Sequence, residues 1–130
     1  MENAESLLLD ALISASHELT LPEKRLLALA LNEIGGRVVN SFRVTGPEFM
    51  EAITGRIEDS AYYLLKRASM DLYNRSINVL DSDSNASEIC LRWLERCQYN
   101  QDEGWVELVW DPELFPSLYS LRRHLSKDAR

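Results

Sequence analysis

The feature that most constrains the fold is the segment LPEKRLLALALNEI, residues 21–34, in which nearly every residue from Leu26 to Leu31 is apolar. Its apolar residues recur at helical spacing and form a wide stripe: Leu26, Leu27, Leu29, Ala30, Leu31 and Ile34. A helix that is apolar around most of its circumference is buried on most sides. We therefore expect this segment to be the central helix of the core, surrounded by the other elements.

Both ends of this segment carry sequence signals for a helix. Thr20 and Glu23 have the spacing of a capping box, in which the hydroxyl accepts a hydrogen bond from a first-turn N–H and the carboxylate accepts one from the cap residue. Pro22 is tolerated in the first turn, and Gly35-Gly36 is expected to end the helix.

The rest of the chain divides into short periodic segments separated by turn signals. They predict a helix over 4–15, a strand over 38–44, a short helix to about residue 53 opened by a second capping box (Thr45 and Glu48), a helix over 58–74, a brief strand over 77–80, a polar loop over 81–87, two hairpin strands over 88–99 and 105–110, and a last helix over 112–125. This order is that of a winged helix. We expect an α+β fold with a helical core, a short strand and a two-stranded antiparallel wing, and a single domain over residues 1–130.

Composition and local signals argue against several classes of protein. No apolar run approaches the ~20 residues that span a bilayer, and the acidic start lacks the basic region of a signal peptide, so we expect a cytoplasmic protein with no membrane contact. Cys90 and Cys97 lie about 23 Å apart if they belong to one strand, which predicts two unpaired thiols.

Catalytic and metal-binding motifs are not evident either. The run from Asp81 to Asn85 imitates the start of a calcium loop, but Ala86 replaces the required glycine and Arg92 the required glutamate. The two histidines, His17 and His124, have no nucleophile or carboxylate at a motif spacing, and no glycine-rich phosphate loop occurs. We expect no enzyme, no metal site and no cofactor.

The net charge of −7 is unevenly distributed, and only the middle of the chain suits a phosphate backbone. Residues 76–121 carry nine acids against two bases, whereas residues 37–75 carry six bases against five acids. The candidate phosphate contacts are Lys66, Arg67 and Arg75, on or just after the 58–74 helix, together with Arg37 and Arg43, which come, like Arg56, from the same near-neutral middle segment. The alternative is a solvated helix face whose cations pair with Glu58, Asp59 and Asp71.

The two wing strands carry large apolar side chains on both faces, which is more than one core can use. If each strand alternates regularly, one face holds Cys90 and Leu94 from the first strand and Trp105 and Val109 from the second. We interpret Cys90, Leu94, Trp105 and Val109 as a homodimer interface, formed by packing this face or by pairing strand edges. The alternative is that the first or last helix of the same chain covers it.

Taken together, these segments resemble a known family, the N-terminal winged-helix domain of the RepA/RepE-type plasmid replication initiators that bind iterons. Four groups of residues, in the right order between about Glu18 and Leu121, carry the resemblance. They are Leu19, Thr20, Leu21, Glu23, Arg25 and Leu26; Phe42, Val44, Thr45, Glu48 and Phe49; Ala61, Tyr62, Leu65, Lys66, Ala68, Leu72 and Arg75; and Tyr99, Gly104, Val106, Leu108, Pro112, Glu113, Leu114, Pro116 and Leu118.

The resemblance implies a function in plasmid replication initiation and copy-number autoregulation. In this family two winged-helix domains occur in tandem, so this chain would be the N-terminal half of a longer initiator whose second domain is absent here. It would form a homodimer when the protein acts as a repressor. In the monomer it would assist binding to double-stranded origin DNA through backbone contacts, with host replication proteins as further partners. The alternatives are a self-contained winged-helix transcriptional repressor and a domain that binds only proteins.

Overall fold

The computed structural model describes residues 4–32, 40–54, 60–80 and 88–128. Its helices are α1 (Ala4–His17), α2 (Leu21–Asn32), α3 (Gly46–Thr54), α4 (Ala61–Tyr73), the short 3-10 helix η1 (Pro112–Leu114) and α5 (Phe115–Asp128). Its strands are β1 (Ser41–Thr45), β2 (Ser76–Leu80), β3 (Glu88–Arg92), β4 (Leu94–Asn100) and β5 (Trp105–Trp110). The mixed helix and antiparallel sheet content confirms the predicted α+β class. The loop predicted over 81–87 lies outside the described residues.

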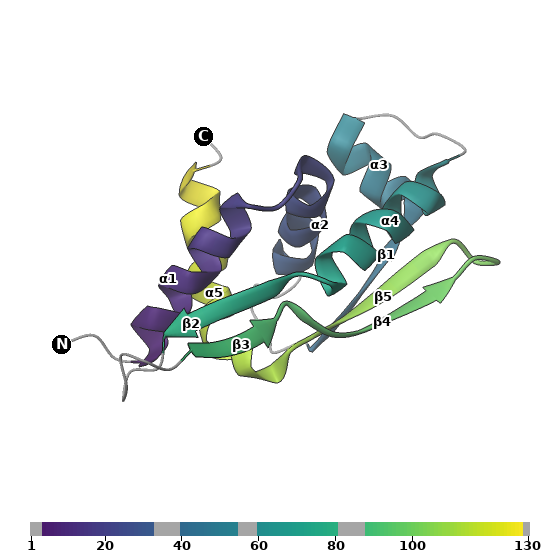
Figure 1. Ribbon diagram of the computed structural model, residues 1–130. Helices are drawn as coiled ribbons and strands as arrows, with labels where there is room; N and C mark the ends of the chain where they lie inside the picture. The colour runs from purple at the N-terminus through teal and green to yellow at the C-terminus, as the bar shows by residue number, and fades with distance from the viewer. Residues whose placement is uncertain (1–3, 33–39, 55–59, 81–87, 129–130) are drawn as a thin grey trace.

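The elements are arranged around a core to which every layer contributes (Figure 1). Helices α1 and α5 lie side by side at one end, next to the β2–β3 hairpin. Helix α2 lies in the middle and contacts α3, α4 and α5. Helix α4 lies between α2 and the long β4–β5 hairpin, so the wing and the helical core meet along it. Within the described residues, no helix is long and apolar enough to cross a membrane.

Helix α2 is central but less enclosed than the sequence predicts. Its buried residues are Glu23, Leu26, Leu27, Ala30 and Leu31. Ala28 is exposed, Leu29 is only half-buried, and 58% of Leu21 is exposed. The expectation of burial on most sides is therefore wrong, because the neighbouring helices cover one face. The predicted end at Ile34 and Gly35-Gly36 lies outside the described residues.

Both predicted capping boxes are present. At α2, the Thr20 backbone N–H donates to Glu23 Oε1 over 3.1 Å, and the Glu23 N–H donates to Thr20 Oγ1 over 3.4 Å. At α3, the Thr45 N–H donates to Glu48 Oε1 over 2.9 Å, and the Glu48 N–H donates to Thr45 Oγ1 over 3.3 Å. These reciprocal bonds satisfy N–H groups that the first turn of a helix leaves without partners.

Among the described residues, the first capping box has an arginine partner and the second has none. Glu23 is fully buried, and Arg75 at the end of α4 donates from Nε to Glu23 Oε2 over 3.0 Å and from Nη2 to Glu23 Oε1 over 2.8 Å. Burial raises the pKa of the Glu23 carboxyl, but the bonds from Arg75 and Thr20 outweigh it and hold that pKa below its usual value of 4.5. This bidentate pair joins the start of α2 to the end of α4.

The strand predicted over 88–99 is two strands. β3 pairs with β2 in a separate hairpin, whereas β4 pairs with β5 in a three-stranded sheet of order β1-β5-β4. Trp93 lies at the break and is fully buried. The short strand predicted at 38–44 is thus the third strand of the wing sheet. The brief strand predicted at 77–80 is the partner of β3.

A β-bulge at Glu95 changes which side chains of β4 face the core. Leu94 lies opposite Trp110, yet Arg96 lies opposite Val109, so two steps along β4 match one step along β5. Such a bulge reverses the alternation of faces on its far side. Leu94 therefore lies on the inner face and is fully buried, so the prediction that it shares the outer face with Trp105 and Val109 is wrong.

The Glu23–Arg75 pair leads to a prediction about stability. We expect Glu23→Gln to lower the free energy of unfolding by about 1–3 kcal/mol, because the amide keeps the shape but loses the charge-assisted bonds to Arg75. The matched control is Glu48→Gln, which changes the equivalent capping residue at α3, where the described residues provide no arginine partner, and should cost clearly less. Urea unfolding monitored by tryptophan fluorescence measures both.

The same pair predicts a pH dependence. Since the folded-state pKa of Glu23 lies below its value of 4.5, its contribution to stability is complete above that pH and is lost as the pH falls through the folded pKa. The difference in unfolding free energy between the wild type and Glu23→Gln should therefore shrink below about pH 4.5. A difference that stays constant from pH 7 to pH 3 would contradict this assignment.

Candidate nucleic-acid interface on α4 and the wing

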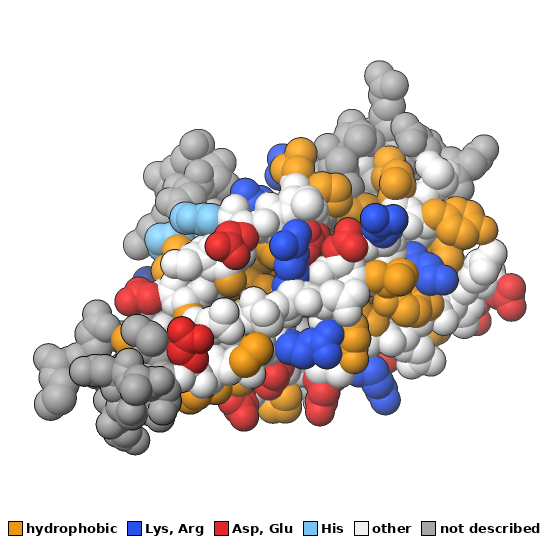
Figure 2. All heavy atoms as spheres, in the orientation of Figure 1, with side chains coloured by type: hydrophobic (Ala, Val, Ile, Leu, Met, Phe, Trp, Pro, Cys, Tyr) orange, Lys and Arg blue, Asp and Glu red, His pale blue; other side chains and the backbone are white. Residues whose placement is uncertain are grey.

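The outward face of α4 carries cations between aromatic side chains. The inner stripe predicted for this helix is correct, since Ala61, Leu65, Ala68 and Leu72 are all buried. That packing turns Tyr63 and Arg67 outward and leaves Lys66 half-buried. Figure 2 shows Lys and Arg side chains gathered over α4 and the β3–β4 junction, next to exposed hydrophobic ones. We call this surface, formed by Tyr63, Lys66, Arg67, Tyr73, Arg92 and Tyr99, the α4 strip.

Contacts between α4 and the wing hold this strip in place. The Lys66 ammonium lies 5.3 Å from the centre of the Tyr99 ring on β4. Gln101, in the turn of the wing, donates from Nε2 to the Tyr63 hydroxyl over 2.9 Å. The Tyr63 ring meets Tyr62 edge-on, with ring centres 5.6 Å apart. Cation–π and edge-to-face contacts of this kind orient both the cation and the rings.

A glycine allows the start of α4 to come this close to α3. Gly46 is the first residue of α3, and a Cβ added there would lie 2.9 Å from the backbone nitrogen of Tyr62. Its N–H donates to the carbonyl of Gly104 in the wing turn over 3.0 Å. Gly104 itself has a φ of 73°, a conformation that glycine adopts without strain. The two glycines therefore join α3, α4 and the wing turn.

Arg92 completes the strip and was not predicted to contact DNA. Its guanidinium lies 4.2 Å over the Tyr73 ring, and its Nε donates to the Tyr73 carbonyl over 3.0 Å, with Nη2 bonded to the same oxygen. The sequence analysis identified Arg92 only as the residue that stands in place of the glutamate required in a calcium loop. The pairing of β3 with β2 is what brings it to the end of α4, and single-strand alternation does not reveal that contact.

The predicted phosphate contacts that lie in the described residues divide into three groups. Lys66 and Arg67 lie together on the strip, and 79% of the Arg67 side chain is exposed, with only a 3.5 Å contact to Asp71. Arg75 is held by Glu23 instead. Arg43 lies on the opposite side of the wing sheet, 3.7 Å over the Trp105 ring and 3.5 Å from Glu107. Arg37 and Arg56 lie outside the described residues.

Burial raises the pKa of two titratable groups beneath the strip. It raises the pKa of the Tyr99 hydroxyl to about 12, with the neighbouring Cys97 adding to the shift. It also raises the pKa of the Cys97 thiol to about 11. Neither group then carries a negative charge at neutral pH. These two groups therefore add no negative charge beneath Lys66, Arg67 and Arg92, and the nearby carboxylate is that of Asp71, 3.5 Å from Arg67.

The residues predicted for a dimer interface do not form one surface. Val109 is half-buried on the outer face of the wing sheet, together with Arg43 and Glu107. Trp105 shares that face but is only 8% exposed, because Arg43 covers its ring; its Nε1 donates to Glu103 over 2.7 Å. Leu94 faces the core, and Cys90 is exposed on β3 in the other sheet. A dimer contact through this face stays a prediction, now without Leu94.

The described residues show no group of three or more histidine, cysteine or acidic side chains that could hold a metal ion. The exposed position of His17 agrees with the prediction that it is a surface residue. The proposed calcium-loop start lies outside the described residues.

Comparisons with known proteins agree with this architecture. The sequence matches the family described as "Initiator Replication protein, WH1" over residues 10–127. The structure is similar to the WH1 domain of MSBI1.176, a replication protein isolated from a multiple sclerosis patient, with a TM-score of 0.77, 26% identity, and coverage of 93% of this chain and 96% of that one. It is also similar to the Pi initiator protein, solved in complex with iteron DNA, with a TM-score of 0.64, 25% identity, and coverage of 82% of this chain and 46% of that one. No curated protein sequence matches the chain. The similarities confirm the predicted winged-helix fold.

The two thiols lead to a prediction about reactivity. At pH 8 and low protein concentration, iodoacetamide should alkylate Cys90 at least about tenfold faster than Cys97, because Cys90 is exposed while burial raises the pKa of Cys97 to about 11. Mass spectrometry of the intact protein gives the two rates, with Cys90→Ser as the control that isolates Cys97. Equal rates for the two thiols would show that α4, whose Ser69 carbonyl lies 3.9 Å from the Cys97 Sγ, does not cover Cys97 in solution.

Proposed function

We propose, from the premise that this chain belongs to the initiator replication protein family as a WH1 domain, that it acts in the initiation of plasmid replication by placing α4 against the backbone of origin DNA. The observation that carries the proposal is the α4 strip. Three cations, Lys66, Arg67 and Arg92, lie there on one surface with aromatic rings that hold two of them in position. Guanidinium and ammonium groups are the side chains best suited to phosphate oxygens.

The charges of the strip set the kind of binding to expect. The whole chain has a net charge of −7, so the strip must act against a repulsive background. Backbone contacts through a few cations give weak, salt-dependent binding and carry no sequence information. The domain would then assist a stronger, sequence-reading contact made elsewhere in a longer initiator.

The similarity to the Pi initiator supports the idea that this domain assists a longer DNA-binding protein. Pi was solved in complex with iteron DNA, and this chain spans 46% of its length. We propose that residues 1–130 form the N-terminal domain of a two-domain initiator that binds double-stranded origin DNA. Contacts with host replication proteins would be made by the same full-length protein.

We further propose that the domain forms a homodimer when the initiator represses its own synthesis. The outer face of the wing sheet is the surface best suited to this role, because Val109 and the edge of Trp105 lie there beside the oppositely charged pair of Arg43 and Glu107. Two copies related by a two-fold axis could bring these residues together in a self-complementary patch. Dissociation would release the monomer that binds the origin, which couples copy number to protein concentration.

A prediction for DNA binding follows from the strip. Replacing Lys66 and Arg67 together by alanine should weaken binding to a duplex and reduce the slope of log K against log salt by about 0.9 for each phosphate that the variant no longer neutralises. The control is Arg123→Ala, which removes an exposed cation from α5, at the other end of the molecule (Figure 1). Fluorescence anisotropy with a labelled duplex at several salt concentrations measures both. A wild-type affinity that does not change with salt would favour a domain that binds only proteins.

A prediction for dimerisation follows from the outer face of the sheet. Val109→Glu should shift the molar mass at a given concentration toward the monomer, because two carboxylates would meet across the two-fold axis without partners. Ser120→Glu, on the exposed side of α5, adds the same charge away from the sheet and should leave the mass unchanged. Sedimentation equilibrium over a range of concentrations gives the answer. An unaltered dimer in Val109→Glu would place the interface elsewhere, and protection of Cys90 from alkylation at high concentration would point to β3.

A further inference from the structure

A groove of about 350 Å³ lies where the end of α1, one face of α2 and the last part of α5 meet. These three helices are neighbours in the fold, with α1 beside α5 and α2 in contact with α5 (Figure 1). The volume is at the lower end of the range for pockets that bind ligands. The groove therefore has room for a few side chains of a partner, whose backbone would lie across the opening.

The face of α2 that lines this groove is the one that the neighbouring helices leave uncovered. Four exposed residues of α2 line it at the spacing i, i+3, i+4 and i+7: Leu21, Lys24, Arg25 and Ala28. Residues at this spacing form one stripe along a helix. The stripe has an apolar residue at each end and two cations in the middle. The exposure of Leu21 and Ala28, which the apolar sequence of α2 does not predict, thus belongs to one continuous surface.

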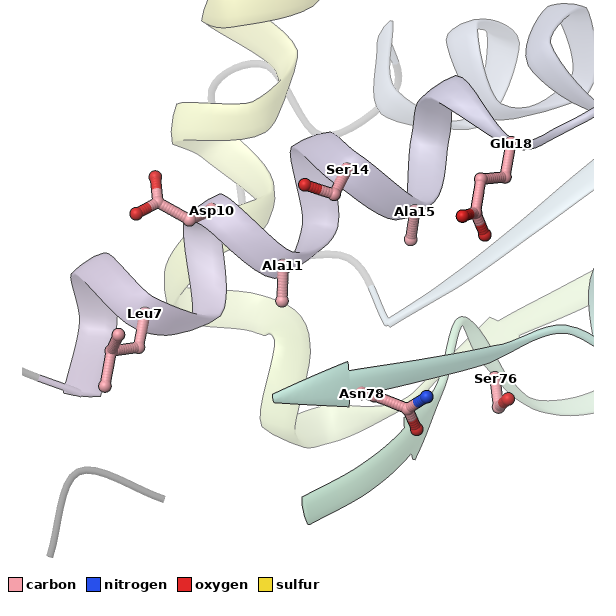
Figure 3. Close-up of a pocket in the computed structure, with 8 residues that line it drawn as sticks. All are labelled: Leu7, Asp10, Ala11, Ser14, Ala15, Glu18, Ser76 and Asn78. Atoms are coloured by element: carbon pink, nitrogen blue, oxygen red, sulfur yellow. The ribbon is translucent and has the colours of Figure 1, made fainter. Parts of the chain in front are cut away.

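The deeper part of the groove is apolar and its exposed part is basic. Leu27 is buried and Leu125 half-buried, so they form the deeper part. Within the described part of the chain, neither Lys24 nor Arg25 forms an ion pair. Glu18, the acid that directly follows α1, lines a different hollow, between α1 and β2 (Figure 3). The two cations are therefore free to pair with the carboxylates of a partner.

We propose that this groove binds an acidic amphipathic helix of a partner protein, which lies along the exposed stripe of α2. Charge complementarity selects the partner, because Lys24 and Arg25 attract carboxylates and repel cations. Apolar side chains of the same helix fill the space above Leu27 and Leu125, as in other complexes in which a helix occupies a groove. A broad anionic surface would also meet the acidic residues of a chain whose net charge is −7, whereas a single helix avoids them.

The spacing of the stripe also specifies the sequence of the partner. Leu21 and Ala28 are seven residues apart, which corresponds to about 10.5 Å along a helix at 1.5 Å per residue. A partner helix that lies along α2 meets them with leucines at i and i+7, and meets the two cations with glutamates at i+3 and i+4. This pattern is the same in both chain directions, so it suits a parallel or an antiparallel helix. The partner motif is thus Leu-x-x-Glu-Glu-x-x-Leu.

Synthetic helical peptides test this assignment on the full chain by fluorescence anisotropy. The probe is fluorescein-labelled AQALAQEEAQLAQA, blocked at both ends, whose leucines and glutamates share one face. The matched control, AQALAEQAEQLAQA, has the same composition and charge, but its glutamates lie on the face opposite the leucines. We expect the probe to bind about tenfold more tightly than this control and than the lysine peptide AQALAQKKAQLAQA. Equal binding of all three peptides, or no binding of the probe, would overturn the proposal.

Charge reversal on the chain locates the binding. Lys24→Glu combined with Arg25→Glu should weaken binding of the probe about tenfold or more. The same variant should bind the lysine peptide more tightly than the probe, an exchange of preference that a misfolded chain would not show. Arg96→Glu combined with Arg123→Glu makes the same charge change at exposed positions that do not line the groove, and should alter binding little.

Leu21→Gln tests the apolar contact without changing any charge. It should weaken binding of the probe about threefold or more, because the exposed leucine at the start of the stripe no longer packs against the partner. Leu64→Gln is the matched control, since Leu64 is an exposed leucine of α4 that does not line the groove. Probe binding that survives both Lys24→Glu/Arg25→Glu and Leu21→Gln would overturn the assignment.

Two other occupants of the groove give different results. The probe should shift the amide NMR signals of residues 21–28; if the same signals shift as the protein alone is concentrated, the groove holds a second copy of the chain and the proposal fails. It also fails if Lys24→Glu/Arg25→Glu weakens binding to a duplex and leaves probe binding unchanged. The proposal does not rest on the proposed DNA function, because Lys66→Ala with Arg67→Ala should leave probe binding unchanged.

Discussion

The bidentate bond between Glu23 and Arg75 is the interaction on which the arrangement of this domain depends. A fully buried carboxylate requires several hydrogen-bond donors, and Glu23 obtains them from Thr20 at the start of its own helix and from Arg75 at the end of α4. The bond therefore fixes two helix ends relative to one another. Because α4 is held at this end and confined by Gly46 at the other, its outer face comes to lie along the wing. The α4 strip depends on that position.

The bond to Glu23 also explains why Arg75 is held within the molecule while Lys66 and Arg67 remain on the surface. Arg75 lies just after α4, and its charge is used within the molecule. Lys66 and Arg67 lie about two turns earlier, where Lys66 contacts the Tyr99 ring and Arg67 is exposed. On the other side of the wing sheet, Arg43 covers the Trp105 ring and pairs with Glu107. These four cations are equivalent by composition, yet only two of them lie on the strip.

Local sequence signals therefore predict the elements better than the roles of their side chains. Capping boxes at Thr20 and Thr45, and the stripe of Ala61, Leu65, Ala68 and Leu72, depend on neighbours three or four residues away, so the sequence alone locates α2, α3 and α4. Leu94 and Arg92 depend instead on pairing between distant segments. The bulge at Glu95 turns Leu94 inward, and the β2–β3 hairpin carries Arg92 to Tyr73. Strict alternation along one long strand misses both, because it assumes one uninterrupted partner.

The distribution of charge over the fold reconciles an acidic domain with a phosphate-binding strip. Asp10 belongs to α1 and Glu18 directly follows it. Helix α1 lies at one end of the molecule, while the cations of the strip lie on α4 and the β3–β4 junction toward the wing (Figures 1 and 2). Salt at physiological concentration screens exposed charges beyond about 8 Å, so each surface acts mainly through its own nearby charges. The acidic end then repels the DNA backbone and leaves α4 as the favoured approach.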